Sequence, residues 1–290
     1  MIRQKEKYLP VVLILPAIIM MYSIIMYPLV YSVYISFTSF NVQTPEKTAF
    51  VGLGNYVEAF NDPELWNAIK NTFIYVSTAV GVELSIGLGL ALLFLRERKE
   101  RSAIRTILIM PMTLTPVVAG LIWRILLTPE VGALNYYQSQ VGLSYIAWLY
   151  DPSYALITTI LVDIWQWTPF VFLVLSAALS SLPSEPFEAA KLDGASRLQI
   201  FRHVTLPLLR SALLVVLLFR IIESFKVYDT IYMLTRGGPG IATENLSYFI
   251  YRIGFLYFRM GYAAALSQIM LLIVTFVTLL LIRFLYKEVA

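Results

Sequence analysis

The chain has 290 residues, of which 59% are hydrophobic and 14% charged, with a mean hydropathy of +0.73 and a formal charge of +4. Because a water-soluble domain carries about 25% charged residues, this composition excludes an ordinary soluble globule and indicates an integral membrane protein. With no cysteine and one histidine, His203, the sequence also excludes disulfides, a thiol nucleophile and a histidine-rich zinc site.

Six apolar runs are long enough to cross a hydrocarbon core of ~30 Å, which takes about 20 helical residues. They fall near residues 9–36, 71–95, 104–127, 154–180, 205–228 and 262–286. We therefore expect an all-helical, polytopic membrane protein with six spans in a single domain, residues 1–290. The first run is far longer than the roughly 7–15 apolar residues of a secretory signal and lacks an A-x-A-like cleavage site, so we expect it to be retained.

Small residues recur every four positions on the second run, at Ser77, Gly81, Ser85 and Gly89. Such a ladder lets the backbone of another helix approach closely. Glu83 lies roughly 200° around the helix from this ladder. Because a lipid-facing carboxyl group is costly, we expect this helix to be enclosed on both sides, by its own bundle and by a cavity or a second subunit.

Prolines divide the next two runs. We expect Pro111 and Pro116 to interrupt the third span and Pro169 to interrupt the fourth. Broken backbone at membrane depth is tolerated where protein or water satisfies the freed polar groups. The breaks therefore indicate spans that face protein or a water-filled cavity.

Lys and Arg are distributed unequally between the loops. The N-terminus, the 96–105 loop, the 181–210 segment and the C-terminal end together carry fourteen, and the loops on the other side carry five. The positive-inside bias therefore predicts that both termini and the 96–105 and 181–210 segments lie in the cytoplasm.

The polar stretch SEPFEAAKLDGASRLQIFRHVTLP lies between the fourth and fifth runs. Ser184 is a candidate N-cap, and Gly194 is expected to end a first helix of about two turns. A second helix is expected from about Ser196 to Pro207, where the next span begins. Composition alone favours an amphipathic element on the membrane surface.

The spacing of this stretch favours another interpretation. EAAKLDGASRLQIFRHVTLP fits the pattern EAA, three residues, G, nine residues, I-x-L-P, with Val204 in place of isoleucine. It resembles the EAA loop of permease subunits of binding-protein-dependent ABC importers, in which the loop forms a coupling helix that seats in a cleft of the ATPase. The resemblance implies ATPase-coupling roles for Glu188, Ala189, Ala190, Asp193, Gly194, Leu206 and Pro207.

The resemblance covers nearly the whole chain. Residues 50–73, 165–183, 219–255 and 261–267 are similar to permeases of the carbohydrate-uptake branch, which carry di- and oligosaccharides and glycerol phosphates. The GLGNY segment and the GGPG loop resemble the first of two unlike permeases, of the maltose and glycerol-3-phosphate type. The resemblance implies a type I ABC importer permease fold and a multi-pass protein of a prokaryotic inner membrane.

The resemblance also implies partners. They are a second homologous permease, two ATPase subunits and an extracytoplasmic sugar-binding protein, besides membrane lipid and without nucleic acid. None of the fourteen glycines is followed by lysine, so the chain has no P-loop, and ATP and Mg are expected on the partner ATPase. H-E-x-x-H and G-x-S-x-G are also missing, so we expect no metal site, no catalytic residue and no enzymatic activity.

Charged residues inside the spans are candidates for a substrate route. Asp163 and Arg220 lie at similar depths, roughly 14 Å from the outer ends of their spans, so they are able to meet. Carboxylate, amide, guanidinium and aromatic groups suit the hydroxyls and C–H faces of a sugar. The candidates are Glu83, Asp163, Gln166, Trp167, Phe170, Arg220 and Glu223.

Alternatives remain for these residues. Asp163, Arg220, Glu223 and Lys226 are equally suited to neutralising one another and holding the bundle together. A stand-alone secondary transporter would use Glu83 or Asp163 for ion coupling, and an intramembrane enzyme would need one of them for turnover. The leading hypothesis is an importer permease that works by alternating access.

Overall fold

The computed structural model describes residues 2–95, 102–129, 131–142 and 144–286. Much of the positive charge predicted to be cytoplasmic, at Arg96, Arg98, Lys99, Arg101 and Lys287, lies outside the described residues. The sidedness of the loops therefore stays a prediction.

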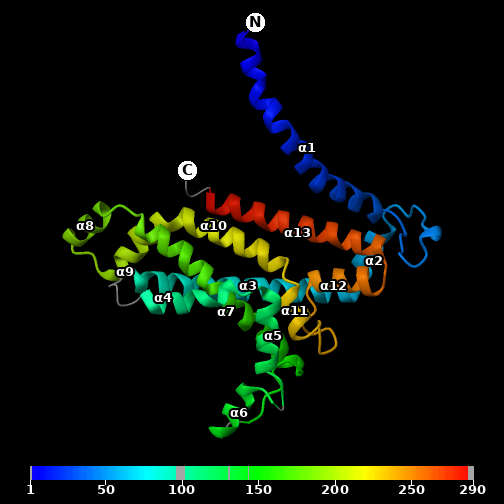
Figure 1. The fold of residues 1–290 in the computed structure, drawn as a ribbon. Coiled ribbons are helices and arrows are strands. Elements are labelled where there is room, and N and C mark those ends of the chain that lie inside the picture. The colour runs from blue at the N-terminus through cyan, green and yellow to red at the C-terminus, as the bar shows by residue number, and fades with distance from the viewer. Residues whose placement is uncertain (1, 96–101, 130, 143, 287–290) are drawn as a thin grey trace. The chain divides into compact units, whose positions relative to one another are not determined.

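The described part of the chain is almost entirely helical, and its one extended pairing is an isolated antiparallel bridge between Thr38 and Phe50. This agrees with the all-helical fold class expected from the sequence (Figure 1). In chain order the helices are α1 (Ile2–Ser36), η1 (Pro45–Lys47), α2 (Gly54–Asn61), α3 (Pro63–Phe94), α4 (Ser102–Ile109), η3 (Met110–Thr113), α5 (Pro116–Leu126), α6 (Ala133–Gln140), α7 (Pro152–Ser180), α8 (Glu185–Leu192), α9 (Arg197–Ile200), η4 (Phe201–Thr205), α10 (Leu206–Phe225), α11 (Asp229–Leu234), α12 (Leu246–Tyr251), η5 (Arg252–Leu256) and α13 (Met260–Tyr286).

Five stretches in the described residues are long and apolar enough to cross a membrane as single helices. They are Leu13–Ser36, Pro63–Phe94, Pro152–Ser180, Arg197–Phe225 and Met260–Arg283. A sixth crossing requires Ala103–Thr113 and Pro116–Leu126 to act together, although they are bent by 100°. The bend lies between Pro111 and Pro116, where the sequence predicted a broken span, because proline supplies no N–H for the helical ladder.

Pro169, in contrast, does not interrupt the fourth span. α7 runs without a break through this proline, so the predicted interruption is wrong. Its neighbour α3 packs closely along it at Gly87, where an added Cβ would lie 2.6 Å from the Cγ1 atom of Val171. We attribute the continuity of α7 to its packing against α3, which contacts the helix directly after the proline.

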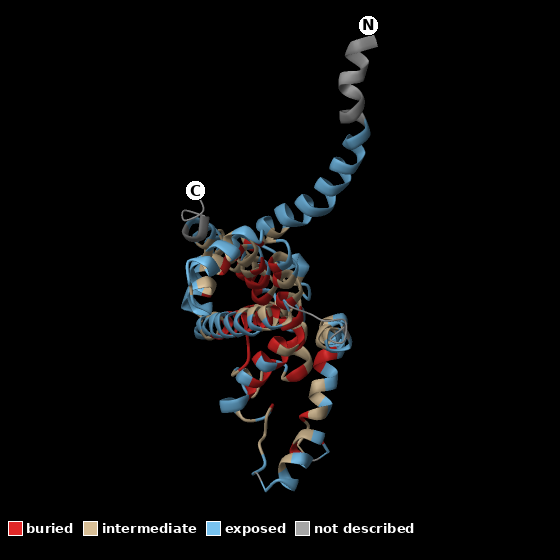
Figure 2. Cartoon of the chain, turned by 90° about the vertical axis from the view of Figure 1, so that its left-hand side faces the viewer, coloured by how far each residue is buried: buried red, intermediate tan, exposed pale blue. Residues whose placement is uncertain are grey.

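The chain divides into two compact units, residues 1–62 with 250–272, and residues 63–249 with 273–290. The single domain expected from the sequence stays a prediction. In the first unit the apolar part of α1 is exposed to its surroundings, whereas the second unit holds most of the buried residues (Figure 2).

Asn55 of the GLGNY segment organises the first unit. It is 7% exposed and donates through Nδ2 to the carbonyl oxygens of Ser36 and Thr38, each at 2.8 Å. The backbone N–H of Gly261 donates to the carbonyl oxygen of Phe40 at 2.9 Å, and a Cβ at Gly261 would overlap the carbonyl oxygen of Thr38. The asparagine and the glycine therefore fix the path of the chain after α1.

Helices α3, α7 and α10 pack on one another in the second unit and carry its main apolar core (Figure 1). Lipid tails are as apolar as these side chains, so van der Waals packing and interhelical hydrogen bonds, and not removal from water, hold such helices together inside a membrane. The fully buried core residues are Ala91, Val171, Phe172, Leu175, Leu209 and Val216.

The GGPG loop is tied to the start of α3. The Nδ2 atom of Asn71 donates to the carbonyl oxygens of Ile241, Ala242 and Glu244 at 3.3, 3.1 and 3.0 Å. Gly237 has a φ of +79°, which favours glycine. The loop is thus an ordered turn.

Candidate functional site

A cluster of charged side chains lies inside the second unit, where α3, α7 and α10 meet. Arg220 on α10 donates through Nε to Oε2 of Glu83 at 2.6 Å and through Nη2 to Oε1 at 2.8 Å. The same Nη2 donates to Oδ2 of Asp163 at 2.8 Å and to Oγ of Ser224 at 3.0 Å. One guanidinium therefore joins three helices.

The side chains of this cluster are buried, so their charges depend on these contacts for stabilisation. Arg220, Asp163 and Ser224 are 1% exposed and Glu83 is 0% exposed. The guanidinium carbon of Arg220 also lies 4.9 Å from the centre of the Trp167 ring, a cation–π arrangement. A buried charge is stable only when it is paired and hydrogen-bonded, and the fork of Arg220 meets this condition.

The sequence predicted that Asp163 and Arg220 meet, and the geometry confirms it. It did not predict that Glu83 takes the two-pronged contact, or that Ser224 and Tyr75 belong to the group. Tyr75 is fully buried near Asp163, and its hydroxyl has no hydrogen-bond partner among the described residues. The i,i+4 spacing of Arg220 and Ser224 is the one signal that would have indicated the serine.

Three other candidates are bonded to or packed on residues outside the charge cluster. Gln166 is 1% exposed, but its Nε2 atom donates to the carbonyl oxygen of Leu114 at 3.0 Å, so it braces the break before α5. Phe170 packs on Phe219, with ring centres 4.9 Å apart. Glu223 accepts from Lys226 at 2.7 Å. The prediction that these charges neutralise one another is therefore met by two separate groups, one buried and one exposed.

A small cavity of about 100 Å³ opens beside the charge cluster. Known ligand pockets have volumes of about 300–1,000 Å³, so this space does not enclose a drug-sized or disaccharide-sized molecule by itself. Asp163 and Arg220 line it from the buried cluster and Glu223 from the exposed pair. The other lining residues are Pro116, Trp167, Lys226, Val227, Tyr228, Asp229 and Thr230.

The second candidate site is the segment from α8 to the start of α10. α8 contains no buried residue, and Glu188 and Ala189 are exposed while Ala190 is partly covered. Asp193 is the C-cap of this helix, and Gly194 follows with a φ of +77°, so the helix ends where the sequence predicted. Ser184 occupies the N-cap position without a side-chain cap bond.

The second half of the segment differs from its prediction. Ser196 caps α9 through a capping box with Gln199, but the helix does not end at Pro207. A π-helical turn, η4, joins α9 to α10, and Leu206 and Pro207 are the first residues of α10. The result is one continuous helix over Arg197–Phe225.

Two exposed leucines flank the turn at Gly194 and were missed by the sequence interpretation. Leu192 is 89% exposed and Leu198 is 73% exposed. Leu198 also lines a groove of about 1,140 Å³, which is formed by residues of α8 and α9 and by the ends of α3 and α7. Exposed apolar side chains beside a charged helix are typical of a surface that binds another protein.

Among the residues that the structure describes, no group of three or more His, Asp or Glu side chains is arranged to hold a metal ion. The two carboxylates of the charge cluster are occupied by Arg220. Its chemistry is ion pairing.

Comparisons with known proteins agree on one family. Residues 83–289 match the family described as "Binding-protein-dependent transport system inner membrane component". The probable ABC transporter permease protein y4oQ of Sinorhizobium fredii is 37% identical over 274 residues, which cover 94% of this chain and 88% of that protein. The trehalose/maltose transport system permease protein MalF of Thermococcus litoralis is 33% identical over 288 residues, 99% of this chain and 95% of the relative.

Solved structures give the same result. A chain of a bacterial ABC transporter involved in the import of the acidic polysaccharide alginate superimposes with a TM-score of 0.84 at 25% identity, covering 98% of this chain and 96% of that one. A complex of such a transporter with an alginate pentasaccharide-bound periplasmic protein gives a TM-score of 0.82, covering 96% and 93%. The chain therefore belongs to the family of inner membrane components of binding-protein-dependent transport systems, as a permease subunit of an ABC transporter.

Proposed function

We propose that this chain is a permease subunit of an ATP-driven importer that passes a di- or oligosaccharide, or a related solute, from an external binding protein to the cytoplasm. The named substrates of similar proteins, trehalose and maltose in one case and alginate in another, support the solute class. The exposed α8 with its flanking leucines is the observation that carries the proposal, because a subunit without a P-loop needs a surface through which a separate ATPase acts.

The proposed assembly contains this permease, a second homologous permease, two ATPase subunits that bind ATP and Mg, and the binding protein. Both termini and the α8–α9 segment face the cytoplasm in this proposal, in line with the distribution of Lys and Arg. Glu188, Ala189, Ala190, Asp193 and Gly194 then form the face that contacts the ATPase. Leu206 and Pro207 connect this face to α10.

Motion reaches the membrane interior through the continuous helix. Arg220 lies twenty-three positions after Arg197, which corresponds to about 35 Å along a helix at 1.5 Å per residue. Arg220 in turn is bonded to Glu83 and Asp163, so displacement of α9 is transmitted to α3 and α7 as well. Closure of the ATPase pair would thereby favour one of two arrangements of the spans, which is a population shift.

The substrate route is proposed to run past the small cavity and to be completed by the second permease. In this arrangement Trp167 and Glu223 are the candidates that face the solute, and Asp163 and Arg220 form the inner wall. Glu83, Gln166 and Phe170 act behind this wall, since their contacts hold the helices together. A cavity of about 100 Å³ is too small for the whole solute, so a second subunit must supply the remainder.

Reconstitution in proteoliposomes tests the transport proposal. Uptake of a radiolabelled oligosaccharide should require ATP, both permeases, the ATPase and the binding protein. Uptake by this chain alone under an ion gradient would instead establish a secondary transporter.

A matched pair of glycine variants tests the coupling surface. Gly194 and Gly142 both have positive φ, +77° and +72°, and neither has an atom within 4 Å of an added Cβ. The changes Gly194→Val and Gly142→Val therefore impose similar backbone strain, but only the first lies in the α8–α9 turn. We expect Gly194→Val to abolish ATPase co-purification or sugar-stimulated ATP hydrolysis, and Gly142→Val to retain both. Equal behaviour of the two variants would refute the coupling role.

A further inference from the structure

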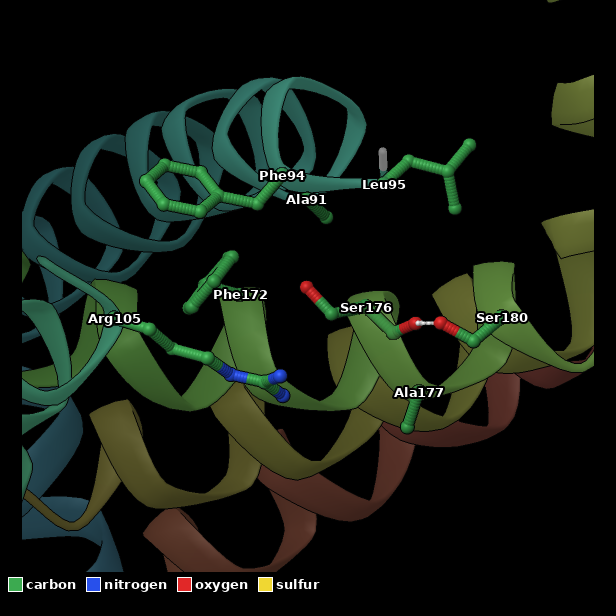
Figure 3. Close-up of a pocket in the computed structure, with 8 residues that line it drawn as sticks. All are labelled: Ala91, Phe94, Leu95, Arg105, Phe172, Ser176, Ala177 and Ser180. Carbon is green, nitrogen blue, oxygen red and sulfur yellow. Dashed lines mark hydrogen bonds between the residues drawn. The ribbon is translucent and has the colours of Figure 1, made fainter. Parts of the chain in front are cut away.

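A pocket of about 390 Å³ lies in the first unit, within the range of about 300–1,000 Å³ that is usual for small-molecule sites. It is larger than the pocket of about 220 Å³ in the second unit (Figure 3), whose Arg105 is already engaged within the chain, 6.0 Å from the centre of the Phe172 ring. The residues that line the larger pocket are Ser39, Phe40, Asn41, Val51, Gly54, Asn55, Glu58, Arg259 and Tyr262.

Helix α2 gives this pocket oxygen acceptors. Asn55 and Glu58 lie three residues apart on α2 and therefore on neighbouring positions of its surface. Asn55 is 7% exposed and donates through Nδ2 to the carbonyl oxygens of Ser36 and Thr38, so its Oδ1 atom remains as an acceptor. The carboxylate of Glu58 is exposed and keeps lone pairs beyond those that its arginine partner uses.

Arg259, just before α13, gives the pocket a guanidinium in a fixed position. Its Nη2 atom donates to Oε1 and Oε2 of Glu58, each at 2.7 Å, and its guanidinium carbon lies 4.7 Å from the centre of the Tyr262 ring. The Nε and Nη1 atoms have no hydrogen-bond partner among the described residues. Arg259 is thus held by two contacts and still has donors available for a ligand.

Asn41, in the loop after α1, adds a further donor. The backbone N–H of Val42 donates to the carbonyl oxygen of Phe258 at 3.1 Å, which brings this loop beside Arg259. The Oδ1 atom of Asn41 accepts from the backbone N–H of Gln43 at 2.8 Å, so Nδ2 is left to donate. The loop after α1 and the segment before α13 therefore contribute donors, whereas α2 contributes acceptors.

Such a lining suits a group that carries both charges. An anion alone would be repelled by Glu58, and a cation alone would be repelled by Arg259. An ammonium donates to carboxylate and amide oxygens, and a phosphate accepts from guanidinium and amide groups, through charge-assisted hydrogen bonds. A zwitterion with an ammonium and a phosphate complements both sets of groups.

The position of the pocket favours a membrane lipid as the source of this zwitterion. Two candidate spans meet at the pocket, since α1 ends at Ser36 and α13 begins at Met260, and the ends of spanning helices lie at the level of the lipid headgroups. Apolar side chains beside the pocket are left uncovered by the unit, which suits contact with lipid. They are Phe50, Leu53 and Val57, with exposures of 74%, 63% and 60%.

We propose that this pocket binds the headgroup of phosphatidylethanolamine, with the ammonium on Glu58 and Asn55 and the phosphate on Arg259 and Asn41. A lipid bound there joins α2 to the segment before α13. It thereby ties together the neighbouring ends of α1 and α13.

Native mass spectrometry of the purified full-length chain with its partner subunits tests the proposal. Samples are titrated with phosphatidylethanolamine, phosphatidylcholine or phosphatidylglycerol of the same acyl chains. Wild type should bind phosphatidylethanolamine most tightly, because the choline ammonium has no N–H to donate and phosphatidylglycerol has no ammonium. Arg259→Gln should lower the affinity for phosphatidylethanolamine by about tenfold or more, as expected for loss of a charge-assisted contact. Glu58→Gln should remove the preference for phosphatidylethanolamine over phosphatidylglycerol.

Matched controls come from the same unit. Glu46→Gln and Lys47→Gln each remove an exposed charge from η1, outside the pocket, and should bind phosphatidylethanolamine like wild type. If Arg259→Gln fails to fold, Gly54→Leu replaces it as the test. An added Cβ at Gly54 has its nearest neighbour at 3.5 Å, an ordinary contact, so this variant fills the pocket and should weaken binding to the same extent.

Three results would overturn the proposal. The first is equal affinity of wild type for phosphatidylethanolamine and phosphatidylcholine, and the second is unchanged binding of phosphatidylethanolamine in Arg259→Gln. The third is displacement of the lipid by low millimolar glycerophosphoethanolamine, which would indicate a site for a soluble zwitterion.

Discussion

Removal of the guanidinium at Arg220 is expected to be among the most destabilising single changes in the chain. Arg220→Met keeps the length of the side chain but deletes four hydrogen bonds, two of them to Glu83 and one to Asp163. Two carboxyl groups then remain buried without their cation. Breaking a buried ion pair on one side costs about 3–5 kcal/mol, and we expect a loss of unfolding free energy in this range.

Two further variants separate the ion pairing from the packing. Lys226→Met breaks the neighbouring pair with Glu223, whose side chains are 54% and 36% exposed. An exposed pair of this kind contributes about 0–1 kcal/mol, so little change is expected. The triple change Glu83→Gln, Asp163→Asn and Arg220→Met removes all three charges, and it should recover part of the stability that Arg220→Met loses.

The assay is equilibrium unfolding of the purified chain in mixed micelles, titrated with a denaturing detergent and followed by tryptophan fluorescence. The reasoning is refuted if Arg220→Met and Lys226→Met have equal unfolding free energies. It is also refuted if the triple variant is less stable than Arg220→Met, because the cost would then arise from lost shape and not from uncompensated charge.

Two other changes test the packing of the second unit. Gly87→Val should lower the unfolding free energy of the purified chain by about 1–3 kcal/mol, because the new side chain overlaps Val171. The control Gly89→Val should change the unfolding free energy little, because no atom lies within 4 Å of a Cβ at this position. Asn71→Leu removes three hydrogen bonds to the GGPG loop and should increase the rates of hydrogen exchange and proteolysis of that loop. Asn67→Leu removes one exposed hydrogen bond to the same loop and should increase these rates less. Equal rates in the two variants would contradict the role of Asn71 in anchoring the loop.

The sequence predicted the helices well where a local rule decides the outcome. Hydropathy and length located the apolar runs, and Gly194 ended α8 because the left-handed conformation there suits glycine. Pro111 and Pro116 predicted the break before α5. The same rule wrongly predicted a break at Pro169, where α7 is continuous and packs closely on Gly87 of α3. No local sequence pattern shows which helix packs beside the proline.

Pro207 shows a second limit of local rules. It was expected to separate a surface helix from a span, but the helix passes through it. The π-turn over Phe201–Thr205 ends two residues before the proline, so the hydrogen-bond register changes close to the missing N–H. A register change of this kind depends on the fit of both flanking helices, which the sequence pattern does not encode.

The sequence predicted which charged residues form the candidate site better than it predicted which of them contact one another. Depth along the spans brought Asp163 and Arg220 together correctly. The contact between Glu83 and Arg220 depends on how α3 is rotated against α10. The small-residue ladder predicted only that Glu83 lies on the opposite face of α3 from the ladder. In the structure Gly81 and Gly89 are exposed on that opposite face, with no atom within 4 Å of an added Cβ, so a partner helix can approach there.

The proposed coupling depends on the combination of the two sites on one helix. The helix over Arg197–Phe225 carries the α9 end of the exposed segment at one terminus and Arg220 near the other. Because Arg220 is bonded to α3 and α7, the three helices resist separate movement, and a force on α9 displaces them as a group. In this proposal an ATPase would cover Leu192 and Leu198, so that apolar burial favours docking, while the buried charges keep the spans rigid enough to respond. Variants that loosen the charge cluster should therefore lower transport per ATP hydrolysed while leaving the affinity of the ATPase for the permease unchanged.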